Sequence, residues 1–406
     1  MTNVGVRIGL HGAAHAVVGA GGGVHPDGWR GAECAWWVAA SDRWHDPRVE
    51  PSVRQRRIDG TPVVETKLAV PGGDVVHRTF VVADRGGCLV VQVSNDSPEP
   101  VAVAVPVREL STTAAGMGTA PQGIELPAGV QVFPLAHRSS LTFAWPLRRS
   151  RWKPTAAFDA ATLPSYEQVV RGWVQTCDRA SRMSLQHDQF VAARSEILLA
   201  SASDIDDVLH DDAALGVLII GERVRMGDPA RTWVSPVADA VRRLGRTEQG
   251  TPLLSRALVA AAHILHAGDE VVGASDVVNV WLQVAERSRG ATPSNASSPF
   301  NANGLAAAVV SVAMVEDQLV RAIAPHEAHV LPASIPAAWR GVNVEAHGLV
   351  ASPQHRVSLA LRWHGPNVAL LWEVDGPPGL QLRAPAVDAR FSSTQQTGEA
   401  LLHVSP

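Results

Sequence analysis

Residues 62–107 read PVVETKLAVPGGDVVHRTFVVADRGGCLVVQVSNDSPEPVAVAVPV and give the clearest structural signal in the chain. Four short runs rich in valine alternate with segments of glycine, proline, asparagine and aspartate. The runs cover residues 63–70, 75–82, 89–93 and 101–107. Short β-branched runs separated by turn residues are typical of antiparallel strands. We therefore predict a four-stranded meander, one face of which must be covered by a second sheet or by helices.

The β pattern extends to both sides of this meander. Residues 1–60 hold short β-like runs, and residues 130–134 and 141–145 read as two further strands. Together these segments predict an antiparallel β-sandwich over residues 1–155, followed by a linker at 148–162. Gly19-Ala20-Gly21-Gly22-Gly23 resembles half of a dinucleotide-binding loop, but no helix start follows it, so we interpret it as a turn and expect no cofactor.

The hydrophobic period changes from two to 3.6 between residues 163 and 325. Helices are predicted over residues 163–181, 187–201, 211–226, 236–244, 253–267, 275–287 and 304–324. The polar segment 288–303 predicts a loop, and loops of that length are often functional. The pattern then returns to β, with a hairpin over residues 356–374 and further strands at 380–383 and 398–404.

The predicted fold class is therefore α+β multidomain. It comprises an N-terminal antiparallel β-sandwich (1–155), a central α-helical domain (163–325) and a small C-terminal β-module (331–406). A chain of 406 residues has room for two or three domains of roughly 100–200 residues each. With 46% hydrophobic and 18% charged residues, the composition is that of a globular protein with a large core.

Charge and cysteine content limit the partners and the compartment. The net charge is −4, without the basic footprint of a nucleic-acid-binding protein. Three widely spaced cysteines, at 34, 88 and 177, fit reduced thiols better than a disulfide framework. No signal peptide is recognisable. A helix needs about 20 apolar residues to span a bilayer, and the longest apolar run (305–315) is shorter. We expect a cytoplasmic protein with no nucleic-acid or membrane partner; its oligomeric state stays open.

The order of these parts resembles the six-hairpin glycosidase superfamily, in which a β-sandwich precedes an (α/α)6 toroid and a small β-module often follows. The residues that carry the resemblance are VVQVSNDS (90–97), SLALRWHG (358–365) and LLWE (370–373). A full toroid has twelve helices, whereas the periodicity of residues 163–325 accounts for about seven. The resemblance therefore implies a toroid-like but incomplete helical domain and a carbohydrate-related ancestry.

Two carboxylates are the candidates for catalysis. Glycosidic cleavage typically uses one carboxyl group as acid and a second as base or nucleophile. Glu222 lies on the apolar stripe of the helix over 211–226, and Glu316 lies on that of the last helix. Burial there would raise either pKa. The alternative is that both are structural members of ion pairs, Glu222 with Arg225 or another arginine and Glu316 with Arg321 or another cation.

Tryptophans are the candidates for binding a sugar. The cluster Trp29, Trp36, Trp37 and Trp44, together with Trp233, could stack on sugar rings in a groove. The alternative is that these large side chains fill the core and the interfaces between sheets.

Histidine pairs occur at spacings that suit a metal on a helix. They are His11 and His15, His263 and His266, and His326 and His329. No third ligand stands at a telling distance from any pair, so we predict no metal site.

The first functional hypothesis is a glycosidase-like protein that binds a carbohydrate, with two alternatives for catalysis: it is lost, or Glu222 and Glu316 serve as acid and base. The alternative is a non-catalytic scaffold or protein-interaction module. An enzyme requires two carboxylates about 5–10 Å apart in one groove. A glycan-binding protein requires exposed tryptophan faces, and a scaffold requires a contiguous exposed apolar patch.

Overall fold

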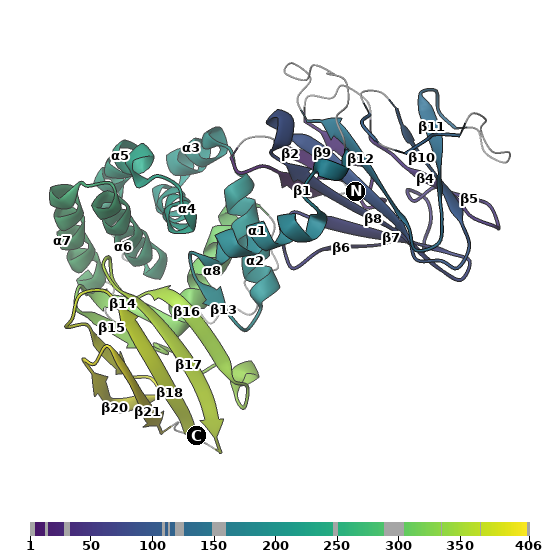
Figure 1. The fold of residues 1–406 in the computed structure, drawn as a ribbon. Coiled ribbons are helices and arrows are strands. Elements are labelled where there is room, and N and C mark those ends of the chain that lie inside the picture. The colour runs from purple at the N-terminus through teal and green to yellow at the C-terminus, as the bar shows by residue number, and fades with distance from the viewer. Residues whose placement is uncertain are drawn as a thin grey trace. The chain divides into compact units, whose positions relative to one another are not determined.

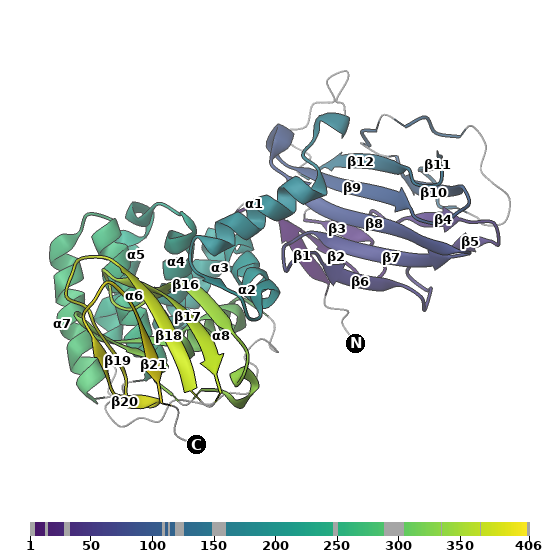
Figure 2. The ribbon, with the colours of Figure 1, turned by 60° about the horizontal axis from the view of Figure 1, so that its bottom comes forward.

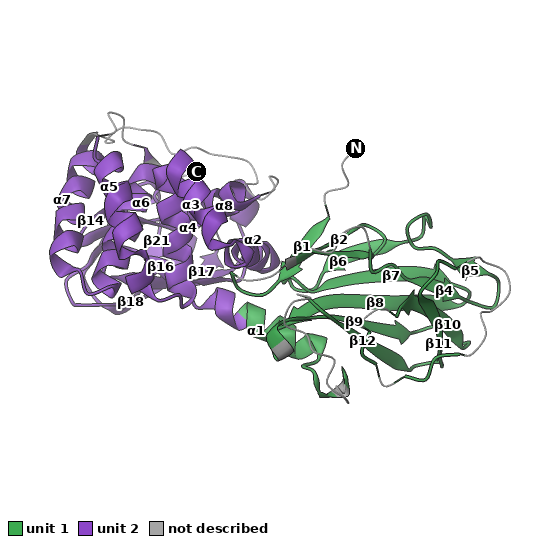
Figure 3. Cartoon of the chain, turned by 90° about the horizontal axis from the view of Figure 1, so that it is seen from above, with its two compact units in different colours: residues 1–174 green, residues 175–406 purple. Residues whose placement is uncertain are grey.

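The computed structural model describes residues 5–12, 15–27, 33–107, 110–112, 114–117, 126–147, 160–246, 251–287, 304–333, 335–365 and 367–403. The chain forms two compact units, residues 1–174 and 175–406 (Figure 3). Strands are followed by helices and then by strands, which confirms the predicted α+β multidomain class (Figure 1). The helices and the C-terminal strands belong to the same unit, and the finer division into three domains stays a prediction. The predicted loop at 288–303 and most of the predicted linker lie outside the described residues.

The described residues of the first unit form twelve strands in three sheets. The sheets have the strand orders β1-β2-β3, β11-β10-β4-β5 and β12-β9-β8-β7-β6. The strands are β1 (Val6–Gly9), β2 (His15–Val18), β3 (Val24–Pro26), β4 (Trp37–Ala39), β5 (Trp44–His45), β6 (Arg54–Arg57), β7 (Val64–Val70), β8 (Gly73–Val82), β9 (Cys88–Asn95), β10 (Val101–Pro106), β11 (Val130–Leu135) and β12 (Ser140–Pro146). A short 3-10 helix, η1 (Asp84–Gly86), joins β8 to β9.

The predicted meander holds for three of its four strands. β7, β8 and β9 pair in antiparallel order, but β10 leaves this sheet and pairs with β4 and β11 instead. The buried side chain of Asn95 accounts for the departure: its amide donates to the carbonyl oxygens of Glu99 (2.8 Å) and Leu135 (3.3 Å). These bonds hold segment 95–99 against β11, so that the chain continues into the second sheet.

The core of the first unit lies between the two larger sheets. Alternate residues of β7 to β10 point inward, as expected for sheets with one buried face, and pack on Phe133, Phe143 and Trp145. Helix α1 (Tyr166–Asp178) packs Val170 against Val63 and Phe80 on the outer face of the five-stranded sheet.

The helices that follow are α2 (His187–Leu199), α3 (Ala202–Asp211), α4 (Ala213–Met226), α5 (Val234–Leu244), α6 (Pro252–Ala267), α7 (Val271–Arg287) and α8 (Leu305–Leu319). Besides η1, the described part of the chain contains the 3-10 helices η2 (Ala160–Thr162), η3 (Ala230–Trp233) and η5 (Ala337–Trp339). The predicted helices are observed, with shifted ends, and α3 is an addition. Its sequence, ASDIDDVLHD, has few apolar residues, but Ser201 and Asp204 form a capping box that starts it.

The last predicted helix, over residues 304–324, is longer than the observed one. The observed helix ends at Leu319, and Val320–Ala324 forms strand β14, which pairs in antiparallel order with β15 (Glu327–Val330). Residues 320–324 read VRAIA, which also fits the two-residue period of a strand. We infer that pairing with β15 makes this segment a strand and ends the helix at Leu319.

The C-terminal strands form two sheets, with the orders β13-β16-β17-β18-β21 and β14-β15-β19-β20. The remaining strands are β13 (Arg182–Met183), β16 (Val344–Val350), β17 (Arg356–His364), β18 (Asn367–Asp375), β19 (Gln381–Ala384), β20 (Asp388–Ser393) and β21 (Thr397–Leu402). The predicted hairpin is confirmed as β17–β18, and its register places Arg356 opposite Asp375. These strands form a layer beside the helices of the second unit (Figure 2).

No helix in the described parts of the chain is long and apolar enough to cross a membrane.

Candidate functional site

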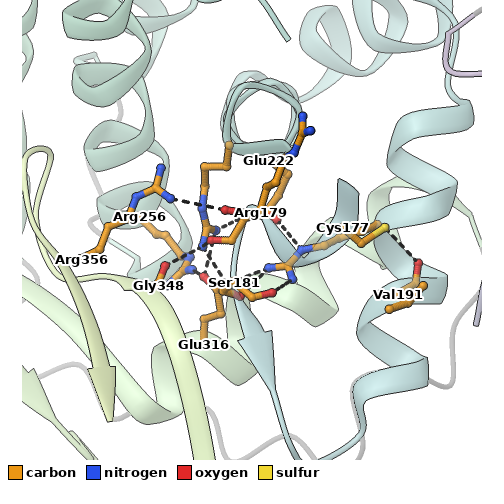
Figure 4. Close-up of polar contacts among 12 residues, drawn as sticks. Cys177, Arg179, Ser181, Val191, Glu222, Arg256, Glu316, Gly348 and Arg356 are labelled. Atoms are coloured by element: carbon orange, nitrogen blue, oxygen red, sulfur yellow. Dashed lines mark hydrogen bonds and ion pairs between the residues drawn. The ribbon is translucent and has the colours of Figure 1, made fainter. Parts of the chain in front are cut away.

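A buried cluster of arginines and glutamates joins four helices of the second unit. Glu222 and Glu316 both belong to it, and Figure 4 shows their side chains among the surrounding cations. We call this cluster the arginine–glutamate network; its members are Ser181, Arg194 of α2, Glu222 and Arg225 of α4, Arg256 of α6 and Glu316 of α8.

Glu316 is the centre of the arginine–glutamate network. Its Oε1 accepts hydrogen bonds from Ser181 Oγ (2.6 Å), Arg194 Nη2 (2.9 Å) and Arg225 Nη2 (3.0 Å). Its Oε2 accepts from Arg225 Nη1 (3.1 Å) and from Arg256. Three guanidinium groups therefore surround one carboxylate, and such charge-assisted bonds are the strong class of hydrogen bond.

Glu222 shares two of these arginines. Arg194 Nε donates to its Oε2 (3.0 Å), and Arg225 donates to its Oε1. Arg225 Nη2 also donates to the backbone oxygens of Ala180 (2.6 Å) and Gly348 (3.3 Å), which ties α4 to the end of α1 and to β16. The predicted Glu222–Arg225 pair is thus present, whereas Arg321 bonds to Asp317 and not to Glu316.

Both carboxylates are sealed from solvent: Glu316 is 0% exposed and Glu222 is 6% exposed. Burial by itself raises the pKa of Glu316, but the charges of Arg225, Arg256 and Arg194 outweigh it and hold this pKa well below its usual range. The direction is opposite to the one expected from burial alone. A carboxyl group held as the anion cannot serve as a general acid near neutral pH.

The geometry therefore gives the acid and base roles of Glu222 and Glu316 no support. Neither carboxylate lines either of the two described pockets, and their described partners are the arginines of the network and Ser181. What is observed is the alternative interpretation, membership of an ion-pair network.

The candidate tryptophans are buried as well. Trp36, Trp37, Trp44 and Trp233 are between 2% and 8% exposed, and Trp29 lies outside the described residues. Trp36 donates to the carbonyl oxygen of Gly21 (2.8 Å) and Trp37 to Asp46 (3.3 Å). Trp36, Trp37 and Trp44 pack within the first unit and Trp233 within the second, and none of these buried rings offers a stacking face, which matches the alternative interpretation given for them.

A pocket of about 380 Å³ lies between α6 and the β17–β18 hairpin. We call it the α6–hairpin pocket. Its polar lining comes from His263 and His266 of α6, Ser352, Gln354 and His355 of the turn before β17, Arg356 at the start of β17 and Asp375 at the end of β18.

Two features of the backbone shape the α6–hairpin pocket. The β17–β18 register sets Arg356 and Asp375 opposite each other at the open end of the hairpin. The second feature is Gly376, with φ of +135°, where an added Cβ would lie 2.6 Å from the oxygen of Gln354. Only glycine permits this close approach of the two pocket walls.

The turn beside the pocket is fixed by His355. Its Nε2 lies 2.8 Å from the carbonyl oxygen of Pro377, which can only accept, so Nε2 carries the proton. Its Nδ1 then accepts from the hydroxyl of Ser352 at 2.7 Å. Both side chains are buried, at 2% exposure or less. They hold the wall of the pocket in one shape.

Nearby arginines influence two titratable groups of the α6–hairpin pocket. Burial, followed by the charges of Arg356 and Arg225, lowers the pKa of His263 to about 4, so this imidazole is neutral at pH 7. Burial also lowers the pKa of Arg356, and the charge of Arg225 is the next cause, ahead of the opposing attraction of Asp375. The charge of Arg225, a member of the arginine–glutamate network, therefore lowers the pKa of both pocket groups.

None of the described histidine, cysteine, aspartate and glutamate side chains form a group of three that could hold a metal ion. Of the predicted pairs, His263 and His266 line the pocket, and His329 contacts Glu327 at 3.2 Å. His263 Nδ1 contacts the carbonyl oxygen of Pro353 at 3.2 Å.

Sequence reasoning missed Arg194, Arg356 and Asp375. Arg194 follows Phe190 by one helical turn, and a cation on an apolar face is a signal for a buried ion pair. The hairpin around Gly365 was recognised, and counting its register outward would have paired Arg356 with Asp375.

Comparisons with known proteins leave the chain without an assigned family. No protein-family model matches the sequence, and no curated protein matches it. A solved structure described as "Putative kojibiose phosphorylase from human microbiome" is similar with a TM-score of 0.40 and 5% sequence identity, over 98% of this chain and 96% of that one.

Proposed function

We propose that the protein binds a carbohydrate in the α6–hairpin pocket and does not cleave it. The observation that carries this proposal is the pairing of a guanidinium donor, Arg356, with a carboxylate acceptor, Asp375, across one polar pocket. Each sugar hydroxyl both donates and accepts hydrogen bonds, and so requires lining groups of both kinds.

The size and chemistry of the pocket support a small polar ligand. Its volume of about 380 Å³ lies within the range of roughly 300–1,000 Å³ that is common for small-molecule sites. Phenylalanine, tyrosine and tryptophan are absent from its described lining, so recognition would rest mainly on hydrogen bonds and charge. Binding without cleavage follows from the carboxyl groups: Asp375 is the one carboxylate in that lining, whereas most glycosidases use two.

Replacing Asp375 with asparagine is expected to weaken binding of a sugar about 10- to 100-fold, because a hydrogen bond to a charged group is lost in exchange for a neutral one. Isothermal titration calorimetry with a panel of neutral mono- and disaccharides measures the effect. Glu373→Gln is the matched control: Glu373 is exposed on the same strand, two residues away, and does not line the pocket. Equal affinity in Asp375→Asn and wild type, or no sugar bound at all, would contradict the proposal.

A protein-interaction surface is the second candidate. Leu371 of β18 and Leu401 of the neighbouring β21 are 37% and 49% exposed, and the register sets Leu401 opposite Ala369. Exposed apolar side chains on adjacent strands are a feature of partner surfaces when they form a patch. Concentration-dependent sedimentation that is abolished by Leu401→Glu would favour this candidate as a self-association surface.

A further inference from the structure

The arginine–glutamate network and the α6–hairpin pocket together contain more positive than negative charge. The network holds three arginines against two glutamates. The pocket adds the half-buried Arg356 and the exposed Asp375, which leaves four cations against three anions among these side chains. Buried charges are normally balanced, because a surplus in a region of low dielectric is costly. One negative charge is therefore missing from this set of seven side chains.

Arg356 is the cation best placed to receive that charge. It lines the pocket and is only half-buried, whereas Arg194 and Arg225 are buried and bonded to both glutamates. Asp375 faces it across the hairpin but makes no salt bridge to it within 4 Å among the described ion pairs, and the remaining contact of Arg356 is to the backbone oxygen of Arg179 at 3.5 Å. The guanidinium fork is thus free to bind a ligand.

We propose that the sugar bound in the α6–hairpin pocket carries an oxyanion, a carboxylate or a phosphate, which Arg356 binds while Asp375 accepts from the hydroxyl groups. This inference rests on the proposed function and adds the class of sugar. A planar guanidinium suits both groups because it can donate two parallel hydrogen bonds to either of them. A singly charged oxyanion would also bring the count of cations and anions into balance.

Calorimetric titration with four probes tests the inference: methyl glucoside, glucuronate, glucose 6-phosphate and inorganic phosphate. We expect glucuronate or glucose 6-phosphate to bind at least about tenfold more tightly than methyl glucoside, which is the scale of one charge-assisted hydrogen bond. Whichever of the two binds more tightly identifies the source of the oxyanion. The preference should weaken as salt is added, because screening reduces the attraction.

Variants of Arg356 provide the controls. Arg356→Gln should remove the preference for the anionic sugar, and Arg356→Lys, which keeps the charge but not the fork, should keep part of it. Arg390→Gln changes an arginine that is 84% exposed on β20 and should leave all affinities unchanged. Unchanged melting temperatures would show that each variant is folded.

The remaining outcomes separate the two proposals. Equal affinity for methyl glucoside and both anionic sugars would overturn the oxyanion inference and leave carbohydrate binding intact. Binding of inorganic phosphate alone, lost in Arg356→Gln, would support the oxyanion site and overturn the carbohydrate function. Binding of none of the four probes would overturn both.

Discussion

Replacing Glu316 with glutamine is expected to lower the free energy of unfolding by about 3–5 kcal/mol, the cost of leaving buried charge without its partner. The side chain is 0% exposed and accepts from three arginines. Glutamine has nearly the same shape, so the loss reports charge and not packing. Urea denaturation, followed by far-ultraviolet circular dichroism, measures the change.

Because the surplus charge of the arginine–glutamate network is positive, we expect the loss of a glutamate to cost more stability than the loss of an arginine. Glu316→Gln raises the positive surplus of the arginine–glutamate network from one to two, whereas Arg256→Gln removes it. Arg256 is also the most exposed arginine of the three, with 13% of its side chain accessible. We therefore expect Arg256→Gln to cost no more than about 1–2 kcal/mol, in the range of a single hydrogen bond to a charged group.

The double variant completes the comparison. Because the two side chains are in direct contact, their effects should not add, and the double variant should be more stable than the sum of the single losses predicts by about 0.5–3 kcal/mol. Equal losses from Glu316→Gln and Arg256→Gln would contradict the surplus charge on which the oxyanion inference also depends.

The strands were predictable where local signals agree. β7, β8 and β9 combine β-branched runs with turn residues, and β17–β18 alternates on both sides of Gly365, so period and turn chemistry indicate the same pairing. The places where prediction failed depend on distant partners. β10 changes sheet because Asn95 bonds to β11, and Val320–Ala324 becomes a strand because β15 lies beside it.

At the candidate site, too, the sequence predicted burial but not the surrounding charges. Burial of Glu222 and Glu316 followed from their positions on apolar stripes, and the structure confirms it. The direction of the Glu316 pKa did not follow, because all three arginines that lower it, Arg194, Arg225 and Arg256, come from other helices. Periodicity places a residue on one face of its own helix, but the charges that meet it there depend on how the helices pack.

His77, in the first unit, gives the second large effect. It lies on β8 at 1% exposure, stacks on Trp36 with ring centroids 4.5 Å apart, and contacts the hydroxyl of Thr79 at 3.1 Å. Its described contacts include no carboxylate, and burial lowers its pKa from 6.5 to about 3. The folded protein therefore keeps this imidazole neutral where the unfolded chain protonates it.

The sign of the pH dependence follows from this shift. Below pH 6.5 the unfolded chain binds a proton that the folded protein does not, so acid favours unfolding. The stability contributed by neutral His77 is complete above pH 6.5 and is lost as the pH falls toward 3. At 1.36 kcal/mol for each pKa unit, the full loss is about 4–5 kcal/mol.

His77→Phe, which keeps a ring against Trp36, should remove most of this acid sensitivity. Urea midpoints between pH 4 and pH 7, read from pulse-labelled amides of β7, β8 and β9, isolate the first unit. His25→Phe, at a histidine whose side chain is 59% exposed in the same unit, should behave as wild type. A wild-type midpoint for these strands that stays constant from pH 7 to pH 4 would contradict the prediction.

Acid should therefore separate the two units. The pKa of Glu316 is lowered, so the stability that its anion contributes is present above the ordinary carboxyl range and is lost only as the pH falls through the lower folded value. His77 begins to act against folding about two pH units earlier, near pH 6.5. As the pH falls from 7 to 4, we expect the amides of β7 to β9 to lose protection against urea before those of α4 and α8. In the double variant His77→Phe, Glu316→Gln, the amides of α4 and α8 should instead lose protection first. His77→Phe makes the first unit less sensitive to acid, and Glu316→Gln makes the second unit less stable.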